Sequence, residues 1–259
     1  MELSEKERQR YKKHLQLDAI GPQGQLHLKN GRVLVVGAGG LGSPVLMYLA
    51  AAGVGSLTIV DDDLVKLPNL QRQVIHTTPA IGLSKVTSAG EHLHRMNPEV
   101  ALHLIPERLQ KTNAEAIFTG QHVVVDCTDN LEARLLINET CARLSLPFVY
   151  GAVYEFEGQV SVFDAKRGPC LRCMLPEQLV PAAIPDPETH GLLGTVPGVI
   201  GLLQATEVIK LLAGIGDALI GKLVLFDALS VGLTRISIPK RKDCPVCGIS
   251  TIEENRTNN

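Results

Sequence analysis

The sequence has no tryptophan, and its aromatic residues amount to 3% of 259 residues. Apolar residues nevertheless make up 45% of the chain, so a sizeable hydrophobic core is possible and global disorder is excluded. A core that is poor in rings is built from leucine, valine, isoleucine and alanine, which are typical of a parallel sheet covered by helices. The length suits one large α/β domain, with or without a small appendage.

An excess of charge of one sign is also missing. The formal net charge is −2 and no long acidic or basic run occurs, which argues against bulk binding of nucleic acid or of an anionic membrane. No stretch approaches the roughly 18 uninterrupted apolar residues of a membrane-spanning helix. Residues 1–6 carry mixed charge rather than the apolar core of a secretory signal. We therefore expect a cytoplasmic protein in which the six cysteines do not form three disulfides.

Short apolar runs alternate with helical patterns up to residue 150. The pattern predicts strands at residues 32–36, 57–60, 100–105, 122–126 and 148–150, and helices at 43–52, 84–96, 113–118 and 130–144. Ser84 is a candidate cap for the second of these helices. Strands and helices that alternate at this spacing predict an α/β fold with a Rossmann-like, doubly wound, mostly parallel sheet.

The pattern changes after Gly151. The sequence predicts strands at 159–163, 222–226 and 235–238, which we expect to extend the sheet in antiparallel fashion, and a buried apolar helix at 199–212. We expect a single domain over residues 1–259. It would have an N-terminal helical arm at 1–30, whose residues 3–13 lie outside the main core, and a proline-rich, mobile crossover segment at 175–195.

A glycine-rich motif follows the first predicted strand. Residues 37–42, Gly-Ala-Gly-Gly-Leu-Gly, fit the pattern G-x-G-x-x-G between a strand and a helix. Glycines let the backbone turn tightly and approach phosphate groups, which the free N–H groups at the start of the helix attract. Asp61 ends the second strand, about 20 residues further on, where an acid holds a ribose. The motif indicates a nucleotide site without saying which nucleotide binds.

Polar residues further along the chain favour phosphate chemistry over the NAD site that the glycine loop first suggests. One group is the segment from Asn69 to Gln73, which contains Arg72. The others are Lys85 and the segment from Asp126 to Asn130. Hydride transfer needs no additional cation beside the phosphates, whereas nucleotidyl transfer does, because negative charge grows on phosphate oxygens in the transition state. Each residue alone is an ordinary surface charge, but together they form a plausible catalytic set.

Two Cys-x-x-Cys pairs, Cys170–Cys173 and Cys244–Cys247, lie about seventy residues apart. Two such pairs supply the tetrahedral four-thiolate site that zinc prefers, with a redox pair or disulfides as alternatives. Because four thiolates leave no open coordination position, we expect a structural zinc knuckle that tethers the tail at 240–259 to the body. Cys127 and Cys141 are expected in or near the core.

Together these motifs resemble the ThiF/MoeB/HesA family, which is related to ubiquitin-activating enzymes. The resemblance covers nearly the whole chain, including residues 198–207 and both cysteine pairs. It implies ATP and magnesium as cofactors. The residues that it places in the nucleotide site are Gly37, Gly39, Gly40, Gly42, Asp61, Asp63, Asn69, Arg72, Gln73, Lys85, Asp129 and Asn130.

The resemblance also implies individual roles. The glycine loop would bind the phosphates and Asp61 the ribose. Asn69, Arg72 and Lys85 would contact the triphosphate, while Asp129 would hold magnesium. Arg72, Lys85 and Asp129 are therefore the candidate catalytic residues.

Members of the family join the C-terminal glycine carboxylate of a ubiquitin-like sulfur carrier, which ends in Gly-Gly, to AMP and release pyrophosphate. The chemistry is consistent, because a carboxylate is already ionised near neutral pH and no general base is required. Catalysis then reduces to in-line positioning and to neutralising charge on the α-phosphate and the leaving pyrophosphate. The resemblance further implies a homodimer.

Two positions depart from the family pattern. Members often carry an arginine that reaches the ATP of the partner subunit, whereas this chain has Lys13, which keeps the charge but lacks the bidentate fork. Many also carry a crossover cysteine that bonds to the carrier, where this chain has Pro187 and no cysteine between Cys173 and Cys244. Proline is no nucleophile, so we expect an adenylation-only enzyme with a separate sulfur donor. Nearby His190 is expected to be an ordinary loop residue.

Three alternatives remain open at this point. A relative could adenylate a different carboxylate, such as that of a peptide or of a modified tRNA, although the near-neutral charge counts against tRNA. A non-catalytic scaffold would bind the carrier without consuming ATP. A nicotinamide dehydrogenase would share the glycine loop but would leave Arg72, Lys85 and Asp129 without a role.

Overall fold

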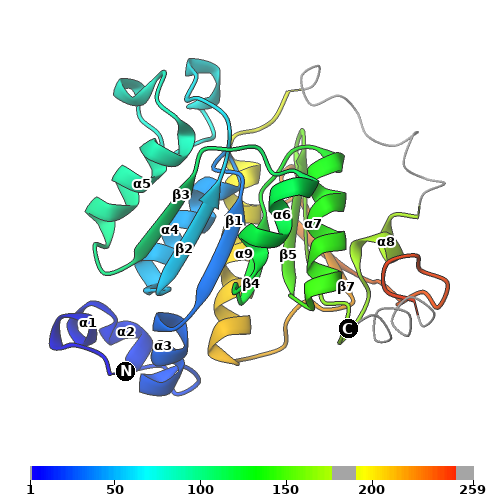
Figure 1. Cartoon of the computed structure of the whole chain (residues 1–259), viewed down its shortest axis with the longest axis horizontal. Helices are drawn as coiled ribbons and strands as arrows, with labels where there is room; N and C mark the ends of the chain where they lie inside the picture. Colours follow the sequence, from blue (N-terminus) through cyan, green and yellow to red (C-terminus); the bar gives the residue numbers. More distant parts are fainter. Residues whose placement is uncertain (1, 177–190, 249–259) are drawn as a thin grey trace.

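The computed structural model describes residues 2–176 and 191–248, and one eight-stranded sheet forms its centre (Figure 1). The strand order is β3-β2-β1-β4-β5-β6-β7-β8, with parallel pairing from β3 to β5 and antiparallel pairing from β5 to β8. The strands are β1 (Arg32–Val36), β2 (Ser56–Val60), β3 (Ala101–Ile105), β4 (Val123–Asp126), β5 (Phe148–Tyr154), β6 (Glu157–Phe163), β7 (Lys222–Asp227) and β8 (Gly232–Ser237). The predicted doubly wound sheet with an antiparallel extension is confirmed.

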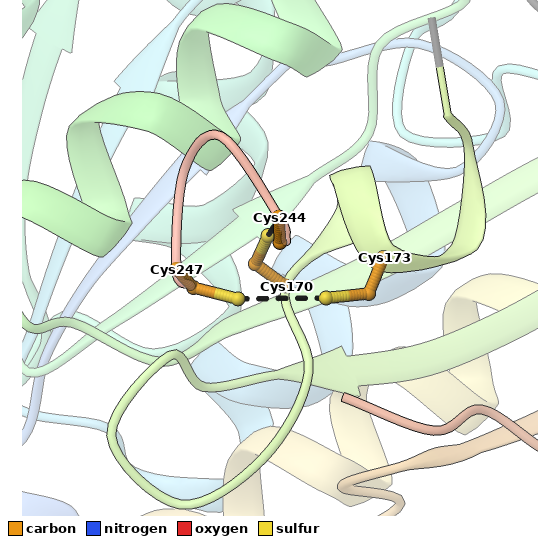
Figure 2. A group of neighbouring side chains, drawn as sticks. All are labelled: Cys170, Cys173, Cys244 and Cys247. Atoms are coloured by element: carbon orange, nitrogen blue, oxygen red, sulfur yellow. Dashed lines mark hydrogen bonds between the residues drawn. The ribbon is translucent and has the colours of Figure 1, made fainter. Parts of the chain in front are cut away.

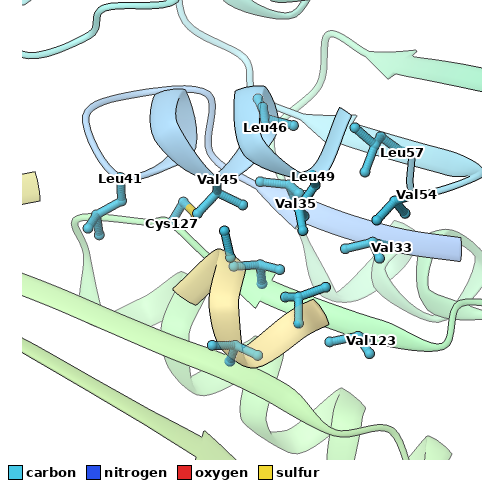
Figure 3. Packing of buried hydrophobic residues seen from close by; sticks show 14 of the residues in the cluster. Val33, Val35, Leu41, Val45, Leu46, Leu49, Val54, Leu57, Val123 and Cys127 are labelled. Carbon is cyan, nitrogen blue, oxygen red and sulfur yellow. The ribbon is translucent and has the colours of Figure 1, made fainter. Parts of the chain in front are cut away.

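Helices cover both faces of the sheet because residues along each strand point alternately into two apolar layers. Val35 of β1 points into a layer with α4, α5 and α9, whereas Leu34 points into a layer with α6 and α7. Figure 3 shows the first layer, where Val35 packs with side chains of α4. Cys127 and Cys141 are buried free thiols in these layers, as predicted. The helices are α4 (Gly42–Ala52), α5 (Lys85–Met96), α6 (Lys111–Phe118), α7 (Leu131–Leu144) and α9 (Thr195–Ala213).

Helix α9 is the buried apolar helix that the sequence predicts. By length and composition alone it would qualify as a membrane span, but half of its most apolar window is buried inside the structure. Gln204 in this helix has no exposed surface, and its Nε2 donates to the carbonyl oxygens of Asp126, at 2.7 Å, and Val149, at 3.3 Å. The apolar character of α9 is therefore explained by its place in the core, where Gln204 links β4 to β5.

The N-terminal arm packs onto the body through buried side chains, although Tyr11 belongs to neither of the two main apolar layers. Tyr11 is 4% exposed, and its hydroxyl accepts a hydrogen bond from Asn97 Nδ2 at 2.9 Å. The Tyr11 ring closes over Gly53, whose φ is +79° and where a Cβ would lie 2.3 Å from the ring. The arm therefore depends on a glycine at the end of α4. Its helices are α1 (Glu5–Arg10), α2 (Lys12–Leu15) and α3 (Gly21–Lys29).

Several local predictions need correction. Ser84 precedes α5, but its side chain makes no capping hydrogen bond. Strand β5 continues past Tyr150 to Tyr154, and β8 begins at Gly232 rather than at Arg235. These strands are longer because each finds an antiparallel partner, which the pattern of one strand alone does not reveal. The remaining short elements are α8 (Leu171–Met174) and the 3-10 turns η1 (Leu67–Asn69) and η2 (Thr78–Ala80).

Asn97 fastens the arm to the end of α4, because it has no exposed surface and also donates to the carbonyl oxygen of Ala50 at 2.7 Å. In Asn97→Ala, the Ala50 carbonyl oxygen and the Tyr11 hydroxyl each lose the hydrogen bond that Asn97 Nδ2 donates to them. We therefore expect the free energy of unfolding to fall by about 1–3 kcal/mol in urea titrations. The exposed Asn30→Ala is the control and should stay within about 0.5 kcal/mol of wild type. Equal stability of the two variants would contradict this role.

Candidate functional site

The polar residues that the sequence singles out gather where the parallel strands end. Strands β1 and β4 are neighbours, but the chain leaves them towards opposite faces, with α4 on one face and α7 on the other. Such a switch point is where open α/β sheets bind ligands. Residues 37–41 follow β1, residues 127–130 follow β4, and Asp61 follows β2, so all three segments border the same edge.

Two glycines shape the loop after β1. Gly37 has φ +101°, and a Cβ there would lie 2.5 Å from the carbonyl oxygen of Cys127 in the loop after β4. A Cβ at Gly42 would lie 2.1 Å from the carbonyl oxygen of Gly37. At Gly39 and Gly40, by contrast, the nearest atoms to a Cβ are side-chain atoms at 3.4 Å and 3.2 Å. The turn itself therefore requires glycine at 37 and 42.

The outer side of this loop presents backbone donors. Within residues 2–176 and 191–248, the amide N–H groups of Gly39 and Gly40 donate to no protein acceptor. They lie just before α4, an 11-residue helix whose N-terminal end carries a partial positive charge. A bound anion would satisfy these donors, as phosphate groups do at the same place in other proteins.

Asp61 fastens the glycine loop to the end of β2. Its Oδ2 accepts a hydrogen bond from the Ala38 N–H at 2.7 Å, and its Oδ1 accepts one from the Asp63 N–H at 2.9 Å. Burial raises the pKa of Asp61, while the Lys85 ammonium and the two N–H donors oppose that rise. Carboxylate oxygens accept more than one hydrogen bond each, so Asp61 keeps capacity for a hydroxyl donor of a ligand.

Lys85 begins α5 and forms an ion pair with Asp63, with Nζ and Oδ2 2.7 Å apart. The two side chains differ in exposure, at 6% for the lysine and 55% for the aspartate. The hydrogen bond from Lys85 lowers the pKa of Asp63, so this carboxylate stays ionised. A buried ammonium whose partner is exposed can exchange that partner for a phosphate group and remain charge-compensated.

The segment between β2 and α5 brings Arg72 and Gln73 to the glycine loop. If Gly40 carried a Cβ, it would lie 3.5 Å from Cγ of Arg72. A Cβ at Gly39 would lie 3.4 Å from Nε2 of Gln73. The carbonyl oxygen of Asn69 accepts hydrogen bonds from the backbone N–H groups of Arg72 and Gln73, and these bonds fix the turn. Gln73 is 4% exposed, and its Oε1 has no hydrogen-bond partner in the described part of the chain. A buried acceptor without a partner calls for an additional donor, which a hydroxyl group of a ligand could be but a phosphate oxygen could not.

The loop after β4 is held by an ion pair that no motif in the sequence indicates. Asp126 has no exposed surface, and its Oδ2 lies 3.2 Å from Nε of Arg134. Arg134 also donates to the carbonyl oxygen of Thr128 at 2.8 Å and lies 5.1 Å from the centre of the Tyr150 ring. Burial raises the pKa of Asp126, against the opposing effect of the Arg134 charge and of hydrogen bonds from Thr128. This pair fixes the loop that carries Asp129.

Asp129 and Asn130 have different surroundings. Asp129 is exposed, and its Oδ1 accepts a long hydrogen bond, 3.5 Å, from Asn130 Nδ2. The Oδ1 of Asn130 accepts a hydrogen bond from the N–H of Ala133 at 2.9 Å and so caps α7. Asn130 therefore has a structural role that the motif alone does not reveal, while the Asp129 carboxylate is exposed at the edge of the sheet.

The four cysteines of the Cys-x-x-Cys pairs form one buried cluster, as predicted. Figure 2 shows Cys170 and Cys173, at the start of α8, facing Cys244 and Cys247 of the C-terminal segment. All four sulfur atoms lie within 4.8 Å of one another. Sulfur atoms about 2.3 Å from one zinc ion lie roughly 3.8 Å apart, so the cluster has the size of a tetrahedral zinc site. The N–H of Arg241 donates to Cys173 Sγ at 3.4 Å, a contact that suits a thiolate ligand.

Comparison with known proteins assigns the chain to a family. The sequence profile of the ThiF family matches residues 11–246. The chain belongs to the ThiF family. It is 44% identical to the SAMP-activating enzyme E1 of Haloferax volcanii, over 95% of this chain and 92% of that protein. It is 42% identical to the sulfur carrier protein adenylyltransferase of Thermus thermophilus, over 96% of this chain and 93% of that protein.

A solved structure with the same fold is E. coli MccB in complex with AMPCPP and MccA. It superimposes on this ThiF-family chain with a TM-score of 0.82, at 21% sequence identity, over 93% of this chain and 74% of MccB. At this low identity the likeness shows the fold. The adenylyltransferase and sulfurtransferase MOCS3 of Mus musculus is 43% identical over 95% of this chain, which spans 54% of that longer protein.

Lys13 lies away from the site of its own ThiF-family chain. It is exposed on α2, close to Tyr11, which packs on Gly53 at the last turn of α4. The glycine loop lies at the first turn of α4, and a helix of 11 residues is about 16 Å long. The arm and the carboxyl end of β1 accordingly lie at opposite ends of the sheet (Figure 1). A contact of Lys13 with a nucleotide thus requires a second subunit.

Pro187 and His190 lie outside the described residues.

We expect the purified protein to contain one zinc ion per chain, measured by elemental analysis, because four thiolates of the right spacing are present. Metal binding adds to folding free energy, so EDTA should lower the Tm of the wild type. Cys244→Ala removes one ligand and should lower both the zinc content and the effect of EDTA. Cys141→Ala, a buried thiol outside the cluster, is the control and should keep its zinc. Zinc-free wild-type protein with a Tm indifferent to EDTA would contradict the assignment.

Proposed function

We propose that this chain is an ATP-dependent adenylyltransferase that activates the C-terminal glycine carboxylate of a ubiquitin-like sulfur-carrier protein. The observation that carries the proposal is a convergence at one sheet edge. Loop N–H groups that have no acceptor in the described part of the chain, the Lys85 ammonium, the Arg72 side chain and the Asp129 carboxylate border the same switch point. The relatives with 42% and 44% identity are a sulfur carrier protein adenylyltransferase and a SAMP-activating enzyme, which supports a carrier protein as the substrate.

In the proposed site, the glycine loop and the first turn of α4 bind the phosphates of ATP, and Asp61 binds the ribose. Asn69 and Gln73 complete the nucleotide contacts. Asp129 would hold magnesium, which neutralises phosphate charge when bound. Its exposed carboxylate, on a loop fixed by the Asp126 ion pair, supports that role.

The proposed reaction needs no general base. The carrier carboxylate is ionised near neutral pH, and one of its oxygens attacks the α-phosphorus while the bridging bond to the β-phosphate breaks. Pyrophosphate leaves with the electron pair of that bond, so negative charge grows on its oxygens in the transition state. The Arg72 guanidinium and the Lys85 ammonium are the cations that we propose to neutralise this charge.

The geometry counts against a nicotinamide dehydrogenase, because hydride transfer would leave the buried Lys85 ammonium beside the phosphate loop without a role. A different carboxylate substrate and a scaffold without turnover share the same nucleotide site. Neither of them predicts ATP–pyrophosphate exchange that depends on a carrier ending in Gly-Gly, so carrier-dependent exchange distinguishes the proposed function from both.

We also propose that the protein is a cytoplasmic homodimer in which Lys13 of one subunit contacts the nucleotide of the other. Lys13 is exposed and lies at the opposite end of α4 from the loop of its own chain. Apolar surface is available for a second copy, since Leu229, Val231 and Leu233, which lie in and beside β8, are 75%, 79% and 62% exposed.

A separate protein is proposed to supply sulfur. The chain has no cysteine between Cys173 and Cys244, and the buried cluster that contains both is suited to hold a metal rather than to attack an acyl group. The acyl-adenylate would therefore pass to a sulfur donor outside this chain. A covalent carrier–enzyme adduct that thiols cleave would contradict this step.

The proposed function predicts ATP–pyrophosphate exchange that appears when a carrier ending in Gly-Gly is added to the zinc-replete protein. Arg72→Ala and Lys85→Ala should each slow exchange by about 10²–10³, because each removes a cation from the transition state. Arg108→Ala is the control and should exchange at the wild-type rate, since Arg108 is a 61% exposed residue. ATP binding without exchange for any carrier would contradict the function and indicate another carboxylate or a scaffold.

Lys13→Ala should raise the KM for ATP several-fold, by roughly 1 kcal/mol, because it removes one exposed charge–phosphate contact between subunits. The neighbouring Lys12→Ala is the matched control, since Lys12 is equally exposed on the same helix. Steady-state exchange kinetics measure both. Identical kinetics for Lys13→Ala, Lys12→Ala and wild type would show that Lys13 is a solvated surface lysine.

A further inference from the structure

His76 is a buried histidine beside the nucleotide loop to which neither motif nor family resemblance assigns a role. It is 5% exposed and lies in the segment between β2 and α5. Its Nε2 is 2.9 Å from the carbonyl oxygen of Ala38 in the glycine loop, and its Nδ1 is 2.9 Å from Oγ of Ser88 in α5. The ring therefore bridges the glycine loop and the helix that begins with Lys85.

The two contacts determine which ring nitrogen carries the proton. A carbonyl oxygen accepts hydrogen bonds and has no proton to donate, so Nε2 of His76 must bear the N–H. In the neutral ring, Nδ1 then accepts the proton of the Ser88 hydroxyl. Burial lowers the pKa of His76, and the charges of Lys85 and His92 lower it further, against the opposing effects of the Ala38 carbonyl and Asp61. The neutral ring with its proton on Nε2 is the form that fits.

This hydrogen bond controls the direction of a phosphate donor. A peptide unit is planar and trans, so its carbonyl oxygen and the next N–H point in opposite directions. With the Ala38 oxygen held towards His76, the Gly39 N–H points away from the ring, where it has no acceptor in the described residues. If this peptide turned over, a carbonyl dipole would replace the N–H and repel a phosphate. Glycine at 39 makes such rotation easy, because it lacks a side chain.

We propose that His76 is a positioning residue of the nucleotide site, which holds the Ala38–Gly39 peptide so that the Gly39 N–H donates to a phosphate oxygen of ATP. The inference rests on the proposed function for the identity of the ligand. Asp61 holds the N–H of Ala38 from the other side at 2.7 Å, so His76 supplies the second of two restraints on this turn. Through Ser88, it also keeps the loop in register with the helix that carries Lys85.

The test uses two substitutions of similar size. In His76→Gln, the side-chain amide nitrogen falls near the place of Nε2 and can still donate to the Ala38 carbonyl. In His76→Asn, the shorter side chain places its amide near Nδ1 and loses that bond. His94→Asn, an exposed residue of α5, is the control.

We expect His76→Asn to raise the Kd of the ATP analogue AMPCPP, measured by calorimetry, and the KM for ATP by about tenfold. The KM for the carrier should stay within about twofold of wild type. His76→Gln should recover most of the ATP affinity. Wild-type AMPCPP affinity in His76→Asn, or equal losses in both His76 variants, would overturn the proposal.

A measurement on the unaltered protein guards against variants that fold poorly. Heteronuclear NMR of the imidazole nitrogens should show His76 protonated at Nε2 and bare at Nδ1, both without and with AMPCPP. A proton on Nδ1 instead would overturn the proposal. Because AMPCPP binding needs no carrier, a wild-type protein that binds it but shows no exchange would refute the proposed function while leaving this inference testable.

Discussion

The close approach of the loops that follow β1 and β4 is the constraint on which the rest of the site depends. Because Gly37 lacks a side chain, its backbone lies against the Cys127 carbonyl, so close that a Cβ would be 2.5 Å from that oxygen. This approach sets the turn that starts α4 and directs outward the N–H groups that find no acceptor among residues 2–176 and 191–248. It also brings the phosphate-binding loop beside the loop of Asp129, so donors for phosphate and a ligand for a cation share one edge.

Charge around this edge is organised in ion pairs of unequal exposure. Asp126 and Arg134 are 0% and 13% exposed, and their pair is closed to solvent and structural. Lys85 is also buried, but its partner Asp63 is 55% exposed. Separating a pair that is buried on both sides leaves an uncompensated charge, whereas an exposed partner can move into water. The proposed chemistry accordingly depends on the second pair, while the first holds the loop on which Asp129 is carried.

Much of the fold was predictable because the relevant signals are local. The period of apolar residues gave the strands, and the motif spacing gave the glycine loop, Asp61 and the four cysteines. What the sequence did not reveal are contacts between distant residues, such as His76 with Ala38, 38 positions apart, and Asn97 with Tyr11, 86 positions apart. For the buried Asp126–Arg134 pair, the sequence shows only an aspartate at the end of an apolar strand. That Arg134 is its partner became evident from the packing of α7 against β4.

If a carrier carboxylate attacks the α-phosphorus of ATP, a heavy-oxygen label in that carboxylate must appear in the AMP product. The carrier is labelled in its C-terminal carboxylate, incubated with the protein and ATP, and the acyl-adenylate is then cleaved with a thiol. We predict AMP that contains one labelled oxygen, together with unlabelled pyrophosphate, because the new bond joins the carboxylate oxygen to the α-phosphorus. Unlabelled AMP, or label released in inorganic phosphate with ADP, would contradict it.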